Sequence, residues 1–171
     1  LPAISRSKQL MVRILLATGA RIGELVQAEW ENVNFESSQW TIPAEHAKTK
    51  KAFVIPLAPA VAGWFIELHA IACSSRYVLP IRARVDGREG DAHMEPVTLN
   101  AALNNLATVL GNKCRRFTPH DLRSTMRSHL GALGVDVLIA ERCLNHSLGG
   151  LVAIYDKHDY LTERRRALEL W

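Results

Sequence analysis

The segment TPHDLRST, which begins at Thr118, places a histidine and an arginine three residues apart directly behind a helix start. Thr118 suits the N-cap, a proline suits the first helical position, and Asp121 stands where an acidic side chain stabilises the first turn. His120 and Arg123 then share a face near the positive end of the helix, where free backbone N–H groups favour an anion. The segment therefore indicates a phosphate site. A capped helix with a surface arginine and a half-buried histidine is the other interpretation that this spacing allows.

A second arginine of interest occurs early in the chain, in the segment TGARIGEL. Gly19 suits a left-handed helix stop, so Arg21 follows directly on a helix end. Glu24 comes three residues after Arg21, where its carboxylate could hold the guanidinium group in place. Because arginine grips phosphate oxygens through paired hydrogen bonds, Arg21 is a second candidate phosphate ligand. An exposed ion pair is the plainer interpretation of this pair.

Lysines gather between two strand-like segments, WTIP (residues 40–43) and AFVIP (residues 52–56). These segments predict a β-hairpin whose tip bears Lys48, Lys50 and Lys51. From such a tip an ammonium group could reach a groove or a reacting atom, although most tips of this kind only raise solubility. Further along, LNHS places His146 at the end of a predicted helix, and a tyrosine follows nine residues later.

These side chains are scattered along the chain, so the fold must bring them together. Helical spacing of apolar residues predicts a helix that ends at Gly19, a short one near Arg21, and one over residues 59–73. From Thr98 onward the chain reads as helix after helix, over residues 98–110, 118–130 and 136–147, with a last one that ends at Trp171. YVLP, residues 77–80, is a possible third strand, and residues 83–95 predict a mobile loop. We therefore expect an α+β fold, mostly helical with a small antiparallel β-sheet.

Composition limits the class of protein. A chain of 171 residues that is 48% hydrophobic predicts a single domain over residues 1–171, and no apolar run is long enough to span a membrane. Cys73, Cys114 and Cys143 show neither a disulfide nor a zinc pattern, so we expect a reducing cytoplasm. The first residue is leucine, which suggests a piece of a longer protein. The net charge of +4 equals the excess of one segment, which holds Lys113, Arg115, Arg116, Arg123 and Arg127 against Asp121.

Taken together, the order of these residues resembles the catalytic domain of the tyrosine recombinases, the phage integrase family. The resemblance rests on TGARIGEL, the KTK of the hairpin, HDLRST, LNHS and the tyrosine of AIYDKHDY, and it runs through nearly the whole chain. The tail is most similar to integrases of prophages and genomic islands. The resemblance implies the DNA breaking-rejoining enzyme fold and these catalytic residues: Arg21, Lys48, His120, Arg123, His146 and Tyr155.

By this resemblance, Arg21 and Arg123 clamp the scissile phosphate, and Glu24 supports Arg21. His120 and His146 add hydrogen bonds and help to move protons. Lys48 protonates the departing 5′ oxygen, with Lys50 as its rival. Tyr155 is the nucleophile that forms a 3′-phosphotyrosyl enzyme, with Tyr160 as its rival. The family often has glycine before the second histidine, where this chain has Asn145. His129 and His158 match no position of the motif and are expected to be structural or exposed.

The chemistry of a phosphodiester agrees with these assignments. Attack adds negative charge, so catalysis without a metal must concentrate fixed cations and hydrogen-bond donors around the phosphate oxygens, each worth about 3 kcal/mol. A tyrosine of pKa about 10 needs its proton accepted or its oxyanion stabilised. The resemblance accordingly implies no metal, nucleotide or other cofactor.

The partner implied is double-stranded DNA at attachment sites, contacted also by Lys50, Lys51, Arg115 and Arg116. A full-length relative carries an upstream DNA-binding domain, absent from this chain, and assembles as a homo-tetramer on DNA; this chain alone is expected to bind weakly and could be monomeric. We expect a bacterial cytoplasmic protein, associated with the nucleoid when it acts, and no membrane partner. A type IB topoisomerase and a non-catalytic DNA-binding regulator remain alternatives. A metal-dependent nuclease is disfavoured because no paired carboxylates accompany the histidines.

Overall fold

The centre of the molecule is α1 (Arg6–Thr18), an amphipathic helix whose residues Leu10, Ile14 and Leu15 are fully buried. The helix ends at Gly19, which adopts the left-handed conformation with φ 63°. A side chain could not be placed at Gly19, because an added Cβ would lie 2.5 Å from Leu144 Cδ2. Glycine is thus required both by the backbone conformation and by the close approach of another segment.

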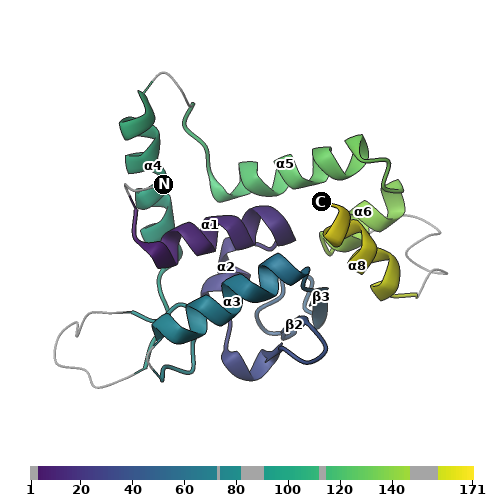
Figure 1. Cartoon of the computed structure of the whole chain (residues 1–171), viewed down its shortest axis with the longest axis horizontal. Helices are drawn as coiled ribbons and strands as arrows, with labels where there is room; N and C mark the ends of the chain where they lie inside the picture. The colour runs from purple at the N-terminus through teal and green to yellow at the C-terminus, as the bar shows by residue number, and fades with distance from the viewer. Residues whose placement is uncertain (1–3, 73, 82–90, 112–114, 147–157) are drawn as a thin grey trace.

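The computed structural model describes residues 4–72, 74–81, 91–111, 115–146 and 158–171. After α1 come α2 (Ile22–Val26), a 3₁₀ turn (Trp30–Asn32), β1 (Val33–Asn34), β2 (Gln39–Ile42), β3 (Phe53–Pro56) and α3 (Pro59–Ala72). The second half is helical, with α4 (Pro96–Leu110), α5 (Pro119–Ala132), α6 (Val137–Cys143) and α8 (Leu161–Leu170) (Figure 1). The mostly helical fold with a small antiparallel sheet is as the sequence predicts.

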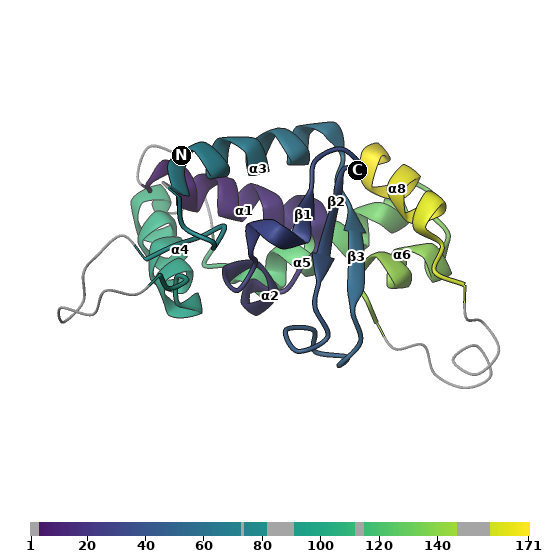
Figure 2. The same ribbon diagram turned by 90° about the horizontal axis from the view of Figure 1, so that it is seen from below.

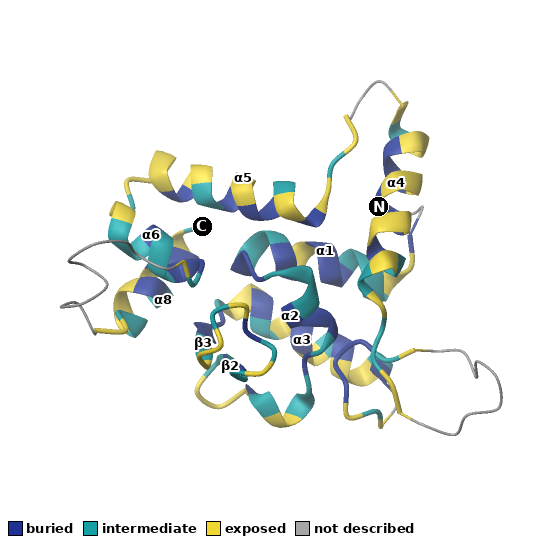
Figure 3. Cartoon of the chain, turned by 180° about the vertical axis from the view of Figure 1, so that it is seen from behind, coloured by how far each residue is buried: buried dark blue, intermediate teal, exposed yellow. Residues whose placement is uncertain are grey.

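Helices α3 and α5 both pack against α1. Figure 3 shows that α5 turns its buried residues toward α1 and leaves its opposite side exposed. The last helix, α8, packs against α6 and β3, beside the sheet (Figure 2). No helix within the described part of the chain is long and apolar enough to cross a membrane.

The predicted hairpin is confirmed, since β2 and β3 pair antiparallel with Trp40 opposite Ile55. The third strand is not the predicted one. β1 takes that place next to β2, whereas Tyr77 and Pro80 form only isolated bridges, to Glu29 and His93. In the apolar run at residues 77–80, Tyr77, Val78 and Leu79 are all buried without alternation, so the run packs into the core rather than covering one face of a sheet.

The predicted helices are present with altered ends. The helix predicted over residues 136–147 ends at Cys143, because Asn145 turns into the left-handed region with φ 50°. The helix predicted over residues 118–130 continues to Ala132. Most of the loop predicted at residues 83–95 lies outside the described residues, and its last residues, 91–95, contain no helix.

Candidate active site

Arg123 lies at the centre of the candidate site. It sits on the buried face of α5, with only 7% of its surface exposed. Its guanidinium group donates one hydrogen bond to the carbonyl oxygen of Gly19, at the end of α1, and another to that of Leu144, just after α6. One side chain therefore joins three segments that are far apart in the sequence. Arg21 lies two residues after its partner Gly19, and His146 lies two residues after its partner Leu144.

The charge of Arg123 is held in an unfavourable environment. Burial and, to a smaller extent, the positive charge of Arg21 lower its pKa to about 10, against the opposite effects of Glu24 and Glu141. The group stays protonated at neutral pH. Because the guanidinium group of Arg123 reaches the carbonyl oxygen of Gly19, two residues before Arg21, both arginines belong to the same part of the molecule. Two like charges held together by buried contacts are stabilised by an anion between them.

Arg21 is fixed from its own helix. It is the N-cap residue of α2, and the carboxylate of Glu24 accepts its backbone N–H at 2.8 Å and its Nη1 at 2.9 Å. The Glu24 side chain is 4% exposed and that of Arg21 is 26% exposed. The buried carboxylate thus orients the guanidinium group while part of that group stays open to a ligand, which is the arrangement that the spacing of Arg21 and Glu24 suggests.

His120 occupies the first turn of α5. As predicted, Thr118 is the N-cap: its hydroxyl accepts the Asp121 backbone N–H at 3.3 Å, and Asp121 Oδ2 accepts the Thr118 backbone N–H at 2.8 Å. Hydrogen bonds from the Thr118 side chain and backbone lower the pKa of Asp121. His120 is exposed and borders an open hollow of about 430 Å³, which it shares with Ile22, the residue after Arg21, and with Asn104 of α4.

His146 follows the left-handed residue Asn145 at the end of α6. Its side chain is half-exposed, and its Nδ1 lies 2.5 Å from Oε2 of Glu141. Glu141 also accepts a hydrogen bond from Nε of Arg127 at 2.7 Å. Glu141 gives no signal in the sequence, because it lies five positions before His146 and no helical spacing relates the two.

The lysine-bearing hairpin tip is joined to this region through a side chain. Asn145 Nδ2 donates to Oγ1 of Thr49 at 3.2 Å, and Thr49 is the residue between Lys48 and Lys50. The two lysines themselves are exposed, as is Lys51. The contact brings the KTK segment next to the histidine of LNHS, although nothing in the spacing of the two segments predicts it.

The remaining predicted residues lie just ahead of α8 and α5 or outside the residues that the structure describes. Tyr155 falls outside the described residues. Tyr160, its rival, is the N-cap residue of α8. The centroid of its ring lies 4.6 Å from that of the His158 ring, and the two rings meet edge-on. Arg115 and Arg116 are exposed just ahead of α5, and Arg115 Nη2 lies 3.6 Å from Oδ1 of Asp121.

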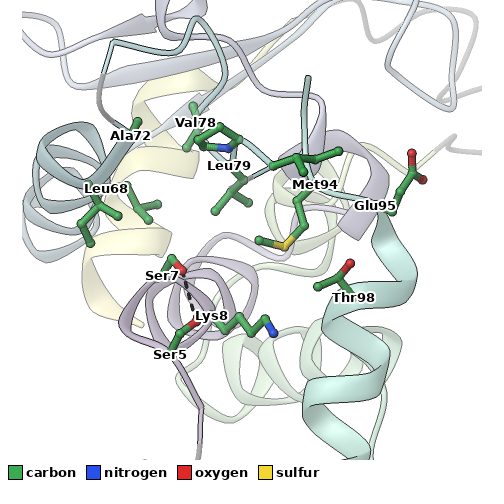
Figure 4. A pocket seen from close by; sticks show the side chains of 13 residues that line it. Ser5, Ser7, Lys8, Leu68, Ala72, Val78, Leu79, Met94, Glu95 and Thr98 are labelled. Carbon is green, nitrogen blue, oxygen red and sulfur yellow. Dashed lines mark hydrogen bonds between the residues drawn. The ribbon is translucent and has the colours of Figure 1, made fainter. Parts of the chain in front are cut away.

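A separate hollow of about 360 Å³ lies between the start of α1, the end of α3 and α4 (Figure 4). It is lined mainly by apolar side chains, among them Leu68, Val78, Leu79 and Met94, and by none of the predicted catalytic residues. In the portion of the chain that the structure describes, no group of His, Cys, Asp and Glu side chains is arranged to hold a metal ion.

Comparison with known proteins gives a consistent result. The model of the "Phage integrase family" matches residues 3–161. Prophage integrase IntA of Escherichia coli K12 is 26% identical over 170 residues, which cover 99% of this chain and 39% of that protein. Tyrosine recombinase XerA of Pyrococcus furiosus is 26% identical over 149 residues, 87% of this chain and 49% of that protein. This chain thus spans about two fifths to one half of the length of these relatives.

Solved structures share the fold. An integrase from mycobacterium phage Brujita superposes with a TM-score of 0.70 at 16% identity, over 98% of this chain and 52% of that one. The Tn1549 transposon integrase in complex with a circular intermediate DNA superposes with a TM-score of 0.65 at 20% identity, over 81% of this chain and 50% of that one.

Proposed function

The chain belongs to the phage integrase family, and from this premise we propose that it is a site-specific DNA recombinase that cleaves and rejoins strands through a 3′-phosphotyrosyl intermediate, in DNA integration and excision. One observation supports this function most strongly: Arg123 on α5 donates to the carbonyl oxygen of Gly19, two residues before Arg21, so two arginines from distant segments meet in one region. A phosphodiester is the anion whose geometry suits two guanidinium groups.

In the proposed cleavage step, the phenolic oxygen of Tyr155 attacks the scissile phosphorus and the bond from phosphorus to the 5′ oxygen breaks. Lys48 gives a proton to the departing 5′ oxygen, and a histidine of the site accepts the phenolic proton. The charge that develops on the phosphate oxygens is stabilised by Arg21 and Arg123. One such donor is worth about 3 kcal/mol, so several together replace a metal ion in this role.

Rejoining reverses these steps. A 5′ hydroxyl attacks the phosphotyrosyl bond, the tyrosine leaves, and the proton transfers run backward. Because the covalent intermediate conserves the energy of the broken phosphodiester, the exchange needs no nucleotide cofactor. This conservation separates the proposed transferase from a hydrolytic nuclease, in which water would take the place of the incoming hydroxyl.

The proposed partner is double-stranded DNA at attachment sites, on which the full-length protein would act as a homo-tetramer in the bacterial cytoplasm, at the nucleoid. Exposed cations beside the site would contact the flanking phosphates; these are Lys50, Lys51, Arg115 and Arg116. Each such contact releases counterions, so the affinity for DNA should fall steeply with salt. A relative solved with DNA, the Tn1549 integrase, lends support to this partner.

The test of this function is a covalent adduct. The protein is incubated with short duplexes of randomised core sequence in EDTA, and the DNA that stays attached after denaturation is recovered and sequenced. We expect enrichment of a defined sequence, loss of the adduct in Tyr155→Phe, and its retention in the control Tyr160→Phe. Free 3′ phosphate or hydroxyl ends without an adduct, or cleavage that depends on a metal, would contradict the proposal.

A further inference from the structure

Glu141 makes contacts that the proposed chemistry has not used. It lies in the last turn of α6, and its two carboxylate oxygens have different partners: Oε1 accepts from Nε of Arg127 on α5 at 2.7 Å, and Oε2 lies 2.5 Å from Nδ1 of His146. The backbone N–H of His146 also donates to the carbonyl oxygen of Glu141 at 3.1 Å. Glu141 thus holds His146 through both its side chain and its main chain.

The chemistry of this contact decides which ring nitrogen bears a proton. Burial raises the pKa of Glu141, but the hydrogen bonds from His146 and Arg127 outweigh it, and the net pKa is lowered. Glu141 is therefore an ionised carboxylate at neutral pH, and a carboxylate only accepts hydrogen bonds. Nδ1 of His146 must then be the donor. In the neutral ring this leaves Nε2 with a lone pair, which is able to accept a proton.

We propose that Glu141 is a positioning residue for His146: it fixes the Nδ1–H tautomer, so that Nε2 is the nitrogen that meets the reacting groups, and Arg127 holds the carboxylate from the other side. The consequence for catalysis rests on the proposed recombinase function. During attack, Nε2 takes the proton of the Tyr155 hydroxyl, and the imidazolium that forms is stabilised by the Glu141 carboxylate. On rejoining, the same proton returns to the phenolic oxygen. This is the logic by which a carboxylate orients a catalytic histidine in hydrolases.

The first measurement does not depend on activity. The ¹⁵N spectrum of the histidines, recorded without DNA at a pH where the imidazole is neutral, reports which nitrogen bears the proton, and His146→Asn identifies the signals of His146. We expect the Nδ1–H form in the unmodified protein, and a shift toward the Nε2–H form in Glu141→Gln and Glu141→Ala. Glu169→Gln is the matched control, because it removes an exposed carboxylate on α8 and leaves Glu141, His146 and Arg127 unchanged. An Nε2–H form in the unmodified protein, or no change in the Glu141 variants, would overturn the proposal.

The second measurement is the rate of covalent adduct formation. General acid–base catalysis contributes about 100- to 10,000-fold, so misorientation of His146 in Glu141→Gln should slow the adduct by on the order of 10- to 100-fold while binding of duplex DNA stays unchanged. Circular dichroism confirms that the variant is folded. If no variant and no unmodified protein forms an adduct, the recombinase function fails while the tautomer result stands. If the unmodified protein forms the adduct and Glu141→Gln matches its rate, the positioning role fails alone.

Discussion

Arg123 shows why an arginine, and not merely a positive charge, is needed at the centre of this site. Its guanidinium group donates to two buried backbone carbonyls, those of Gly19 and Leu144. The planar group has five N–H donors, so it can hold both carbonyls and still present donors to a phosphate. The same side chain therefore organises the candidate site and, in the proposed mechanism, also takes part in it.

Arg123→Lys should distinguish the effect of the guanidinium hydrogen bonds from the effect of the positive charge. A lysine keeps the positive charge but cannot span the carbonyls of Gly19 and Leu144. We expect adduct formation to fall by roughly 100-fold, and the free energy of unfolding to fall by about 1–3 kcal/mol because a buried carbonyl loses its donor. Urea unfolding and adduct kinetics measure the two effects, with Arg116→Lys, at an exposed position, as the control. A variant as active and as stable as the unmodified protein would contradict this role.

Asn145 illustrates how a departure from the usual glycine is accommodated. Its φ of 50° lies in the left-handed region, which asparagine tolerates better than other residues with a side chain. Its amide in addition reaches Oγ1 of Thr49 in the hairpin tip at 3.2 Å, a contact that glycine cannot make. Backbone conformation and side-chain contact can therefore be tested separately.

We expect Asn145→Ala to be less stable than Asn145→Gly by about 1 kcal/mol, because alanine is strained in the left-handed region. Both variants lose the contact with Thr49, so both should slow the step that uses Lys48 to a similar extent, as should Thr49→Val. Thermal unfolding and adduct rates give the comparison. Equal stability of the alanine and glycine variants, or an unchanged rate in Thr49→Val, would count against this account of the turn.

At the scale of elements, local chemistry predicts where helices and strands begin more reliably than what they contact. The cap at Thr118, the stop at Gly19 and the pairing of β2 with β3 follow from residue types at short spacing. The predicted third strand at residues 77–80 was wrong, because a short apolar run is as compatible with an irregular buried segment as with a β-strand. The links of Arg123 to Gly19 and Leu144 span 104 and 21 residues, and no spacing rule reaches that far.

The cap of α5 is an element whose effect can be measured. Thr118→Ala removes the hydroxyl that accepts the Asp121 backbone N–H, and should lower the free energy of unfolding by about 1 kcal/mol. The Thr118 hydrogen bonds lower the pKa of Asp121, so their contribution is present at neutral pH and is lost as the pH falls through that pKa. The stability difference from the unmodified protein should therefore shrink in acid. Ser124→Ala, exposed on the same helix, should show neither effect.

At the scale of the whole molecule, α8 is fastened to its own chain by buried polar contacts. Arg164 is 1% exposed and donates to the carbonyl oxygen of Val54 in β3 at 2.7 Å and to Oδ1 of Asp159 at 2.6 Å. At the other end of the helix, Nε1 of Trp171 donates to the carbonyl oxygen of Leu16 at 3.0 Å. The last helix thus closes the fold over the sheet and α1.

Removal of the Arg164 contacts should weaken the packing of α8 against the rest of the chain. We expect Arg164→Met to lower the free energy of unfolding by about 1–3 kcal/mol, because the partly buried Val54 carbonyl loses its donor. Arg166→Met, exposed on the same helix, should change it by no more than about 0.5 kcal/mol. Urea unfolding followed by tryptophan fluorescence measures both variants. If they lose equal stability, the buried contacts of Arg164 do not fasten the helix.

A shared phosphate site is tested most directly by removing the charge of the phosphate itself. Adduct formation is compared on duplexes with an ordinary phosphate and with a neutral methylphosphonate at the cleaved position, for Arg21→Ala, Arg123→Ala and the control Lys48→Ala. Both arginine variants should lose roughly 100-fold on the phosphate and far less on the methylphosphonate. Lys48→Ala should lose equally on both, because in the proposed mechanism Lys48 acts at the leaving oxygen. Equal losses on the two substrates for Arg21→Ala and Arg123→Ala would show that these arginines do not grip the same phosphate.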